Sequence, residues 1–176
     1  RVGGNETPPR VNTSNIIITD VMASNGVIHA IDTVLSIPGN IVEQLQNSPN
    51  FSTLLSLASP LSTVASILTN SADVTLFAPS NAAFASLPQA LVANITKPEN
   101  KDVLQYILTY HVLGFKQKTQ DILGSRITRV TANGLSVPID ARAEPILVHQ
   151  SAITYADGVS SNGLIHAVDR VLIPPC

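Results

Sequence analysis

The sequence has 176 residues, slightly more than one domain of about 150, and 44% of them are apolar, which excludes extended disorder. Only 12% are charged and the net charge is −2, so the chain offers no basic surface for nucleic acid. No apolar run reaches the ~18 residues needed to cross a bilayer, and we expect no membrane span in this segment.

The beginning of the chain carries a segment that recurs near its end. Residues 25–38 read NGVIHAIDTVLSIP and residues 162–175 read NGLIHAVDRVLIPP, with nine of fourteen positions identical at an offset of 137 residues. An offset of one domain length indicates that both segments close a domain-sized unit. We therefore expect residues 1–38 to be the last strands of a preceding unit plus a linker, and residues 39–176 to be a complete unit.

The first half of the complete unit has helical periodicity. Asn40, with Glu43 three residues later, predicts a capped helix over residues 41–47. Apolar residues then recur at helical spacing through residues 51–68. This part of the chain is therefore expected to be mostly helical.

A short strand and a long helix follow. Residues 73–78 form an apolar run that predicts a strand, and Ser80 is placed to cap the next helix. Residues 100–111 place their apolar side chains on one stripe and predict an amphipathic helix.

From Val112 onward the apolar period drops toward two, and turn signals separate short β-rich runs. Asn133-Gly134 predicts a hairpin with a type I′ turn, because both residues tolerate positive φ. Asp157-Gly158 predicts a further turn. Helices followed by antiparallel strands predict an α+β fold rather than βαβ units.

Several features favour the secretory pathway. The charge is low, and the single cysteine, Cys176, has no partner for a disulfide within the chain; an external partner and a chance thiol both stay open. Four Asn-x-Ser/Thr triplets predict N-glycosylation sites at Asn5, Asn12, Asn50 and Asn94.

Three motifs, in this order, resemble the fasciclin (FAS1) domain family. TLFAPSNAAF at residues 75–84 and NGLIHAVDRVLIPP at residues 162–175 are similar to the family's two homology boxes, and Tyr110-His111 is similar to its tyrosine-histidine motif. The resemblance covers residues 39–176, and residues 11–38 resemble the second box of an upstream FAS1 domain.

This resemblance implies a fold and a class of function. The fold is a wedge-shaped β-sandwich with helices packed from the N-terminal half. The protein is expected to be secreted or at the cell surface, often with tandem domains, and to bind a cell-surface receptor, a matrix component or another FAS1 domain.

The tyrosine-histidine pair supports two interpretations. His111 continues the apolar stripe of its helix, so it can be a core residue with a buried hydrogen bond, while Tyr110 places its ring inside and its hydroxyl toward water. In some animal members of the family the pair, with flanking apolar residues, is described as integrin-binding. Because a fold buries those flanking groups, direct receptor contact would require partial opening.

A second adhesive motif of animal relatives is an acidic residue followed by aliphatic residues just before the second box. Asp20 is followed by Val21 and Met22, which fits that motif. Asp157 is followed by Gly158, and this departure weakens the integrin interpretation for the complete domain.

Catalytic and metal-binding patterns are missing from the sequence. His29 and His166 have apolar strand neighbours and are expected to be hydrogen-bonded core residues, because zinc needs three or four convergent ligands. We find no G-x-S-x-G, P-loop or G-x-G-x-x-G motif, so we expect no enzyme, no cofactor and no metal.

Two functions of different classes follow. The first is an adhesion or matrix-interaction module, whose weak single-domain affinity is raised by clustered copies. The alternative is a carrier of an apolar small molecule, such as the carotenoids that some algal FAS1 proteins bind in a channel. The repeated closing strands also predict that residues 11–38 lie over the complete domain or enter a neighbouring chain, as in a domain-swapped or strand-exchanged dimer.

Overall fold

The signals around residue 40 produce the first helix of the fold. In the computed structural model, which describes residues 10–11, 14–35 and 37–175, α1 (Ile41–Gln46) begins at a capping box. The Asn40 side chain accepts a hydrogen bond from the Glu43 amide at 2.9 Å, and the Glu43 carboxylate accepts one from the Asn40 amide at 3.2 Å. The box satisfies two amides that lack helical partners, and the predicted helix is confirmed to within one residue.

The chain divides into two compact units, residues 1–37 and residues 38–176. The first unit contains β1 (Arg10–Val11), β2 (Ser14–Ala23) and β3 (Gly26–Ile31), which form an antiparallel sheet in the order β1-β2-β3. β2 and β3 form a hairpin whose apolar side chains, among them Val27 and Ile28, are largely exposed.

The helices of the second unit come mainly from its first half, as predicted. Besides α1 they are η1 (Pro49–Phe51), α2 (Ser52–Ala58), α3 (Ser62–Asn70), α4 (Asn81–Ala85), α5 (Gln89–Ile95), η2 (Pro98–Asn100), α6 (Lys101–Tyr110) and η3 (Thr119–Asp121). Ser80 caps α4 through a hydrogen bond from the Ala83 amide at 3.2 Å, which confirms that prediction.

The strands of the second unit form one sheet in the order β5-β4-β10-β9-β8-β7-β6. Their bounds are β4 (Val74–Pro79), β5 (Val112–Leu113), β6 (Arg126–Val130), β7 (Ser136–Asp140), β8 (Leu147–Val148), β9 (Ser151–Ser160) and β10 (Gly163–Val168). The sheet is mixed rather than purely antiparallel as expected, because β4 and β10 run parallel. Every residue of these two central strands is buried, as is typical of a strand covered on both faces.

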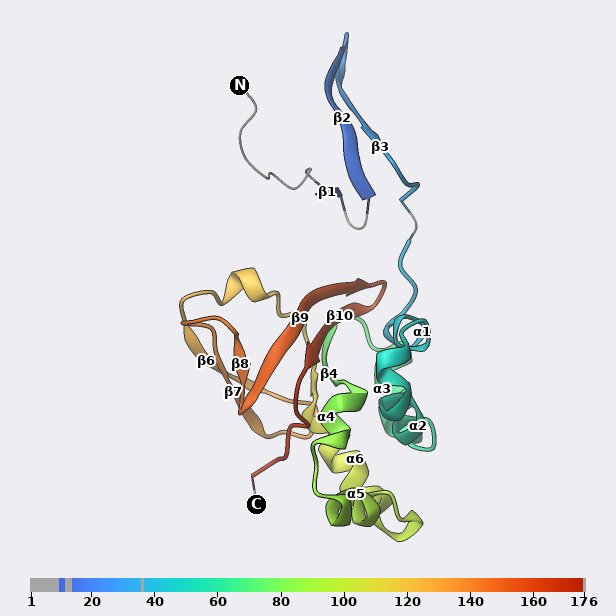
Figure 1. Ribbon diagram of the computed structural model, residues 1–176, viewed down its shortest axis with the longest axis vertical. Coiled ribbons are helices and arrows are strands. Elements are labelled where there is room, and N and C mark those ends of the chain that lie inside the picture. The colour runs from blue at the N-terminus through green and yellow to red at the C-terminus, as the bar shows by residue number, and fades with distance from the viewer. Residues whose placement is uncertain (1–9, 12–13, 36, 176) are drawn as a thin grey trace. The chain divides into compact units, whose positions relative to one another are not determined.

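The two layers of the expected sandwich are halves of this single sheet. They are joined by the ten-residue β9, which pairs with β8 at its first two residues and with β10 along the rest. In Figure 1 helices α1 to α6 lie to one side of β4 and β10, and β6, β7 and β8 lie to the other. The α+β class predicted from the sequence is therefore correct.

Two apolar cores fill the second unit. The first packs the helices on the sheet, and its members include Ile41, Leu54, Leu76, Leu104 and Ile165. The second lies between the halves of the sheet and includes Phe77, Val137, Val148, Val168 and Leu172. β4 and β10 contribute to both cores, because alternate residues of a strand face opposite sides.

The hairpin predicted at Asn133-Gly134 is present, but its turn is not type I′. Five residues separate β6 from β7, and among them only Gly134 has positive φ, at 85°. The Asn133 side chain accepts hydrogen bonds from the Thr131 hydroxyl at 2.6 Å and from the Leu135 amide at 3.0 Å. These bonds build an Asx-type turn, which has replaced the two-residue turn.

Candidate interaction site

Tyr110 and His111, at the C-terminal end of α6, lie in the core of the second unit and are 0% exposed. The Tyr110 hydroxyl donates a hydrogen bond to the Ser136 carbonyl at 3.1 Å, so the expectation that it reaches water is wrong. The β6–β7 hairpin supplies this acceptor, which sequence spacing did not reveal. Burial, together with neighbouring Tyr106, raises the pKa of Tyr110.

His111 is held between α6 and the end of the chain. Its Nε2 accepts a hydrogen bond from the Leu172 amide at 2.9 Å, so the ring proton is on Nδ1, which donates to the Ile107 carbonyl at 2.8 Å. A second proton, on Nε2, would place the ring N–H and the Leu172 N–H face to face as two donors. Burial lowers the pKa of His111 to about 4, against the opposing effect of the Ile107 carbonyl.

The apolar residues beside the pair are buried as well. Leu108, Val112 and Leu113 are at most 2% exposed. The pair and its neighbours thus join α6, the β6–β7 hairpin and the C-terminal segment, and in the closed fold they present no side chain to a partner.

His166 has the opposite tautomer to His111. Its Nδ1 accepts a hydrogen bond from the Asp157 amide at 3.1 Å, and its Nε2 donates to the Gln117 carbonyl at 2.9 Å. The ring stacks on Phe77 with a centroid distance of 5.6 Å. Burial lowers the pKa of His166, opposed by the Gln117 carbonyl and by Asp157. The prediction that His166 is a hydrogen-bonded core residue is confirmed, whereas His29 is exposed.

Asp157 lies inside β9, so the turn predicted at Asp157-Gly158 is wrong. Asp157 has φ 55°, and the pairing of β9 with β10 shifts register beside it. This left-handed residue forms a bulge in a continuous strand. The Asp157 carboxylate accepts hydrogen bonds from the Thr119 amide, at 3.1 Å, and from the Thr119 hydroxyl. Its role in the structure is to hold η3 against the sheet.

Asp20 has the same backbone conformation in the first unit, with φ 59°. Its amide donates to His29 Nδ1 at 3.2 Å. Among the described residues its carboxylate has no hydrogen-bond partner, and the residue is exposed with Val21 and Met22. Asp20 and Asp157 thus occupy equivalent backbone positions with different surroundings.

Two of the four glycosylation triplets can be located. Asn50 and Asn94 are both exposed, in η1 and near the end of α5. The Oδ1 of Asn94 accepts a hydrogen bond from Asn100 at 2.9 Å, which leaves its Nδ2, the atom that glycosylation modifies, turned away from that contact. Asn5, Asn12 and Cys176 lie outside the described residues.

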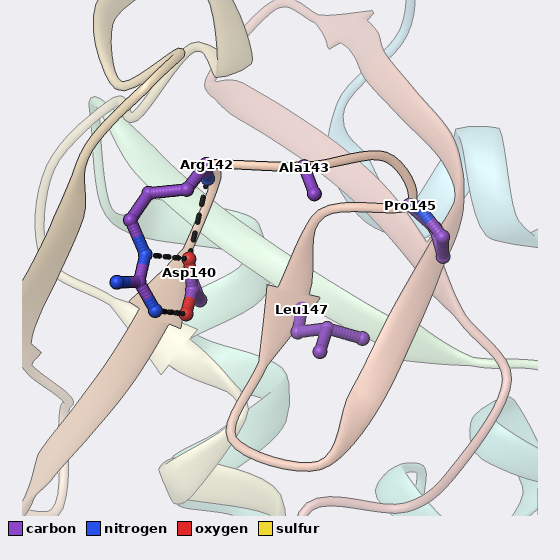
Figure 2. Close-up of a pocket in the computed structure, with 5 residues that line it drawn as sticks. All are labelled: Asp140, Arg142, Ala143, Pro145 and Leu147. Atoms are coloured by element: carbon purple, nitrogen blue, oxygen red, sulfur yellow. Dashed lines mark hydrogen bonds and ion pairs between the residues drawn. The ribbon is translucent and has the colours of Figure 1, made fainter.

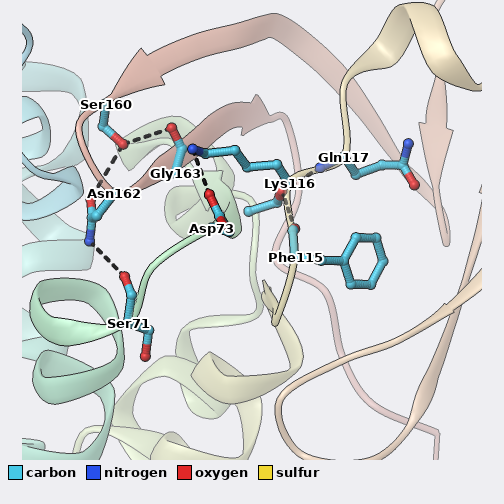
Figure 3. Close-up of polar contacts among 9 residues, drawn as sticks. Ser71, Asp73, Phe115, Lys116, Gln117, Ser160, Asn162 and Gly163 are labelled. Atoms are coloured by element: carbon cyan, nitrogen blue, oxygen red, sulfur yellow. Dashed lines mark hydrogen bonds and ion pairs between the residues drawn. The ribbon is translucent and has the colours of Figure 1, made fainter.

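A polar network holds the segment after β5 to the sheet (Figure 3). The Thr75 hydroxyl donates to the Phe115 carbonyl at 2.7 Å and accepts from the Gln117 amide at 2.8 Å. The Gln117 side chain accepts from Arg129 Nε at 2.8 Å, and Lys116 pairs with Asp73 at 2.7 Å on the surface. The network fixes the Gln117 carbonyl in the position where it accepts the hydrogen bond from His166 Nε2.

β9 presents exposed apolar side chains that sequence reasoning did not select. Tyr155 is 63% exposed and Val159 is 53% exposed, on either side of the Asp157 bulge. Strict alternation along β9 would put both side chains on one face, but the bulge places Tyr155 opposite Ala167 and Val159 opposite Leu164, which face opposite sides of β10.

A shallow surface pocket of about 330 Å³ lies at the β7–β8 connection (Figure 2). It is lined by Asp140, Arg142, Ala143, Pro145 and Leu147. Two hydrogen bonds join the Arg142 guanidinium to the Asp140 carboxylate, at 2.9 and 2.6 Å, and lower the pKa of Asp140 to about 2. A charged pair at the wall distinguishes this pocket from the apolar channel expected of a polyene carrier.

The described part of the chain contains neither a cluster of metal ligands nor a helix that could span a membrane. No three His, Cys, Asp or Glu side chains are grouped so that they could hold a metal ion. No helix there has the length and apolar character that a bilayer crossing requires.

Comparison with known proteins identifies the class. The model of the fasciclin domain matches residues 1–38 and 49–174, and the chain belongs to the fasciclin domain family. It is 34% identical over 135 residues to protein sll1483 of Synechocystis sp., covering 77% of this chain and 73% of that protein.

Animal relatives are much longer than this chain. It is 31% identical over 165 residues to human periostin and 27% identical over 165 residues to the transforming growth factor-beta-induced protein ig-h3 of Sus scrofa, covering 93% of this chain in each case. The chain spans only 19% and 24% of those two proteins.

The fold has a solved counterpart. A FAS1 domain pair from the insect cell adhesion molecule Fasciclin I superposes with a TM-score of 0.67 at 20% identity, covering 92% of this chain and 60% of that one. The likeness shows that the fold is that of a FAS1 domain.

Proposed function

We propose that this protein is an extracellular adhesion or matrix-interaction module that works by binding other proteins, either a receptor, a matrix component or another FAS1 domain. Membership of the fasciclin family carries the proposal. The solved structure with the same fold belongs to a cell adhesion molecule. The exposed triplets at Asn50 and Asn94 support an extracellular location.

The binding residues that the structure supports best are the exposed apolar side chains of β9. Tyr110 and His111 are inaccessible, and the Asp157 carboxylate is occupied by Thr119. Tyr155 and Val159 instead offer exposed aromatic and aliphatic area on the part of β9 that pairs with β10 alone. Tyrosine is enriched among residues that dominate binding energy, because it buries much area at low entropic cost.

Binding through so small an apolar surface is expected to be weak for one copy. Two side chains cannot supply the area of a standard interface of about 1,600 Å², so useful affinity requires several copies on one surface. Adhesion should therefore be measured with the protein displayed densely rather than free in solution.

The experiment compares beads coated with the protein and with two variants. The double variant Tyr155→Ser, Val159→Ser should reduce bead clustering or attachment to cells at least several-fold, because it removes the exposed apolar side chains of β9. The matched control is Leu123→Ser, which removes a side chain that is 59% exposed elsewhere in the unit.

Three outcomes count against the proposal. One is that densely coated beads do not adhere and the protein stays monomeric at high concentration, which would show that it is not adhesive. Another is equal adhesion by the double variant and the unmodified protein, which would show that these β9 side chains do not mediate adhesion. The last is an equal loss in the Leu123→Ser control.

A further inference from the structure

The β2–β3 hairpin of the first unit repeats the construction of the β9–β10 hairpin of the second, 137 residues later. Ile16 lies opposite Ile31 as Ile153 lies opposite Val168, and the remaining pairs and both register shifts coincide in the same way. The two hairpins are thus equivalent in backbone as well as in sequence.

Their internal hydrogen bonds coincide too. In both hairpins an aspartate amide donates to a histidine Nδ1, an aspartate carboxylate accepts from a strand amide, and a serine hydroxyl donates to a carbonyl. The pairs are Asp20–His29 and Asp157–His166, Asp32–Asn15 and Asp169–Ala152, and Ser14–Thr33 and Ser151–Arg170. The first hairpin therefore has its final geometry although it lacks the surroundings of the second.

The surroundings make a large difference to burial. Leu164 and Ile165 of β10 are 4% and 7% exposed, because β4 pairs with β10 and the helices pack on it. Val27 and Ile28, at the equivalent positions of β3, are 50% and 55% exposed. The same side-chain pattern is a core surface in one hairpin and an open surface in the other.

A glycine marks the missing strand. At Gly163 an added Cβ would overlap the carbonyl oxygen of Val74, because β4 approaches that backbone closely. At Gly26, the equivalent residue, an added Cβ would meet nothing within 4 Å. The first hairpin has the close-approach glycine without the strand that requires it.

Two polar side chains of the first hairpin also lack the partners that their equivalents have in the second. Asn162 accepts a hydrogen bond from the Ile41 amide and donates to the carbonyls of Leu68 and Ser71. Its equivalent, Asn25, has no side-chain partner among the described residues. The carboxylate of Asp20 likewise lacks the threonine that Asp157 holds.

We propose that residues 14–31 are the closing hairpin of a second fasciclin body, and that β3 binds a strand of that body equivalent to β4. The strand would run parallel to β3, with its first residue opposite Gly26 and its sixth opposite Ile31, as in the pairing of β10 with β4. The asparagine equivalent to Asn162, Asn25, would then bind the helices of that body.

The occupant is a fasciclin body whose strand equivalent to β4 has a free edge, rather than a second copy of residues 38–176. In that unit both edges of β4 are already paired, one with β10 and the other with β5. A second copy thus offers no free strand of this kind. The fasciclin model matches residues 1–38 as well as 49–174, which agrees with two bodies. The inference does not depend on the adhesive function proposed above.

The test grafts the first hairpin into the place of the second. Residues 151–168 of the full chain are replaced by the sequence of residues 14–31, so that a fasciclin body must be closed by the first hairpin. We expect cooperative unfolding with a midpoint within about 10 °C of the unmodified protein. A control graft shifted by one residue turns every side chain to the wrong face and should lose cooperative unfolding.

Glycine variants make the test specific for the parallel strand. Gly26→Ala in the unmodified chain should leave the thermal midpoint unchanged. The same glycine changed to alanine within the graft, where β4 would lie beside it, should lower the midpoint by more than about 10 °C.

Four results would overturn the proposal. They are loss of cooperative unfolding in the graft, equal stability of the graft and its shifted control, and insensitivity of the graft to the glycine substitution. The fourth is a dimer of the unmodified chain that Val27→Lys abolishes, which would make a second copy the occupant.

Discussion

Two buried histidines, His111 and His166, are each fixed in one neutral tautomer by a backbone amide that points at a ring nitrogen. Such a ring cannot take up a proton without losing that hydrogen bond. Burial is the main reason that the pKa of each lies below its ordinary value, and for His111 it lies near 4. The residues that resemble a binding motif therefore control stability.

The pH dependence follows from this arrangement. Between the ordinary histidine pKa of 6.5 and the folded value of about 4, the unfolded chain binds a proton that folded His111 does not. The free energy of unfolding should thus have its full value above pH 6.5. As the pH drops to 4, protonation of His111 in the unfolded chain should lower it by about 3 kcal/mol, and His166 should lower it further. Urea unfolding at pH 7, 5.5 and 4.5 measures this loss of stability.

The variant His111→Gln separates this effect from general acid sensitivity. It should be less stable than the unmodified protein at pH 7, because it loses buried contacts, but its stability should fall less between pH 7 and 4.5. An equal pH slope for variant and unmodified protein would show that His111 does not cause it.

Among the elements, β10 is stabilised by a side chain at the turn that precedes it. Asn162 joins that turn to α1 and to the end of α3 through hydrogen bonds of 2.9, 2.8 and 3.3 Å. Ser160 also donates to the Gly163 carbonyl there, at 2.9 Å (Figure 3). This turn thus holds the helices to the centre of the sheet.

Asn162→Ala should lower the free energy of unfolding by about 2–3 kcal/mol, because it leaves part-buried amide and carbonyl groups without partners. Urea unfolding of the second unit measures the loss. The matched control, Asn25→Ala, changes the equivalent residue of the first hairpin and should leave that free energy unchanged. Equal effects of the two substitutions would contradict the assignment.

Local signals in the sequence sufficed for the helices and failed for strand geometry. The Asn40–Glu43 box and the Ser80 cap act within a few residues, so spacing alone predicts them. The parallel pairing of β4 with β10 joins residues about ninety positions apart and depends on the packing of the whole unit. The bulge at Asp157 likewise involves a hydrogen bond from its amide to His166 on the next strand.

The candidate site shows the same division. Tyr110 and His111 were recognisable as a motif, and the sequence favoured a buried histidine. The acceptors and donors that fix the pair, at Ser136 and Leu172, lie on distant strands and loops. The exposure of Tyr155 and Val159 could be learned only from the shape of β9.

At the scale of the molecule, the same closing hairpin occurs twice, and the second copy is the one that β4 and the helices pack against. In the β9–β10 hairpin β10 is buried by β4 and the helices, whereas in β2–β3, with the same register and internal hydrogen bonds, the apolar residues of β3 are exposed. Burial here is set by the neighbouring body and not by the hairpin sequence. An apolar strand with a free edge is a site where another strand can add.

The most direct measurement of this claim is native-state hydrogen exchange on the unmodified, monomeric chain. We predict that the amides of β10, Gly163–Val168, exchange only through global unfolding, while those of β3, Gly26–Ile31, exchange at least a hundredfold faster despite their similar sequence. Equal protection of the two strands would mean that the first hairpin is already covered within this chain, and the account would be wrong.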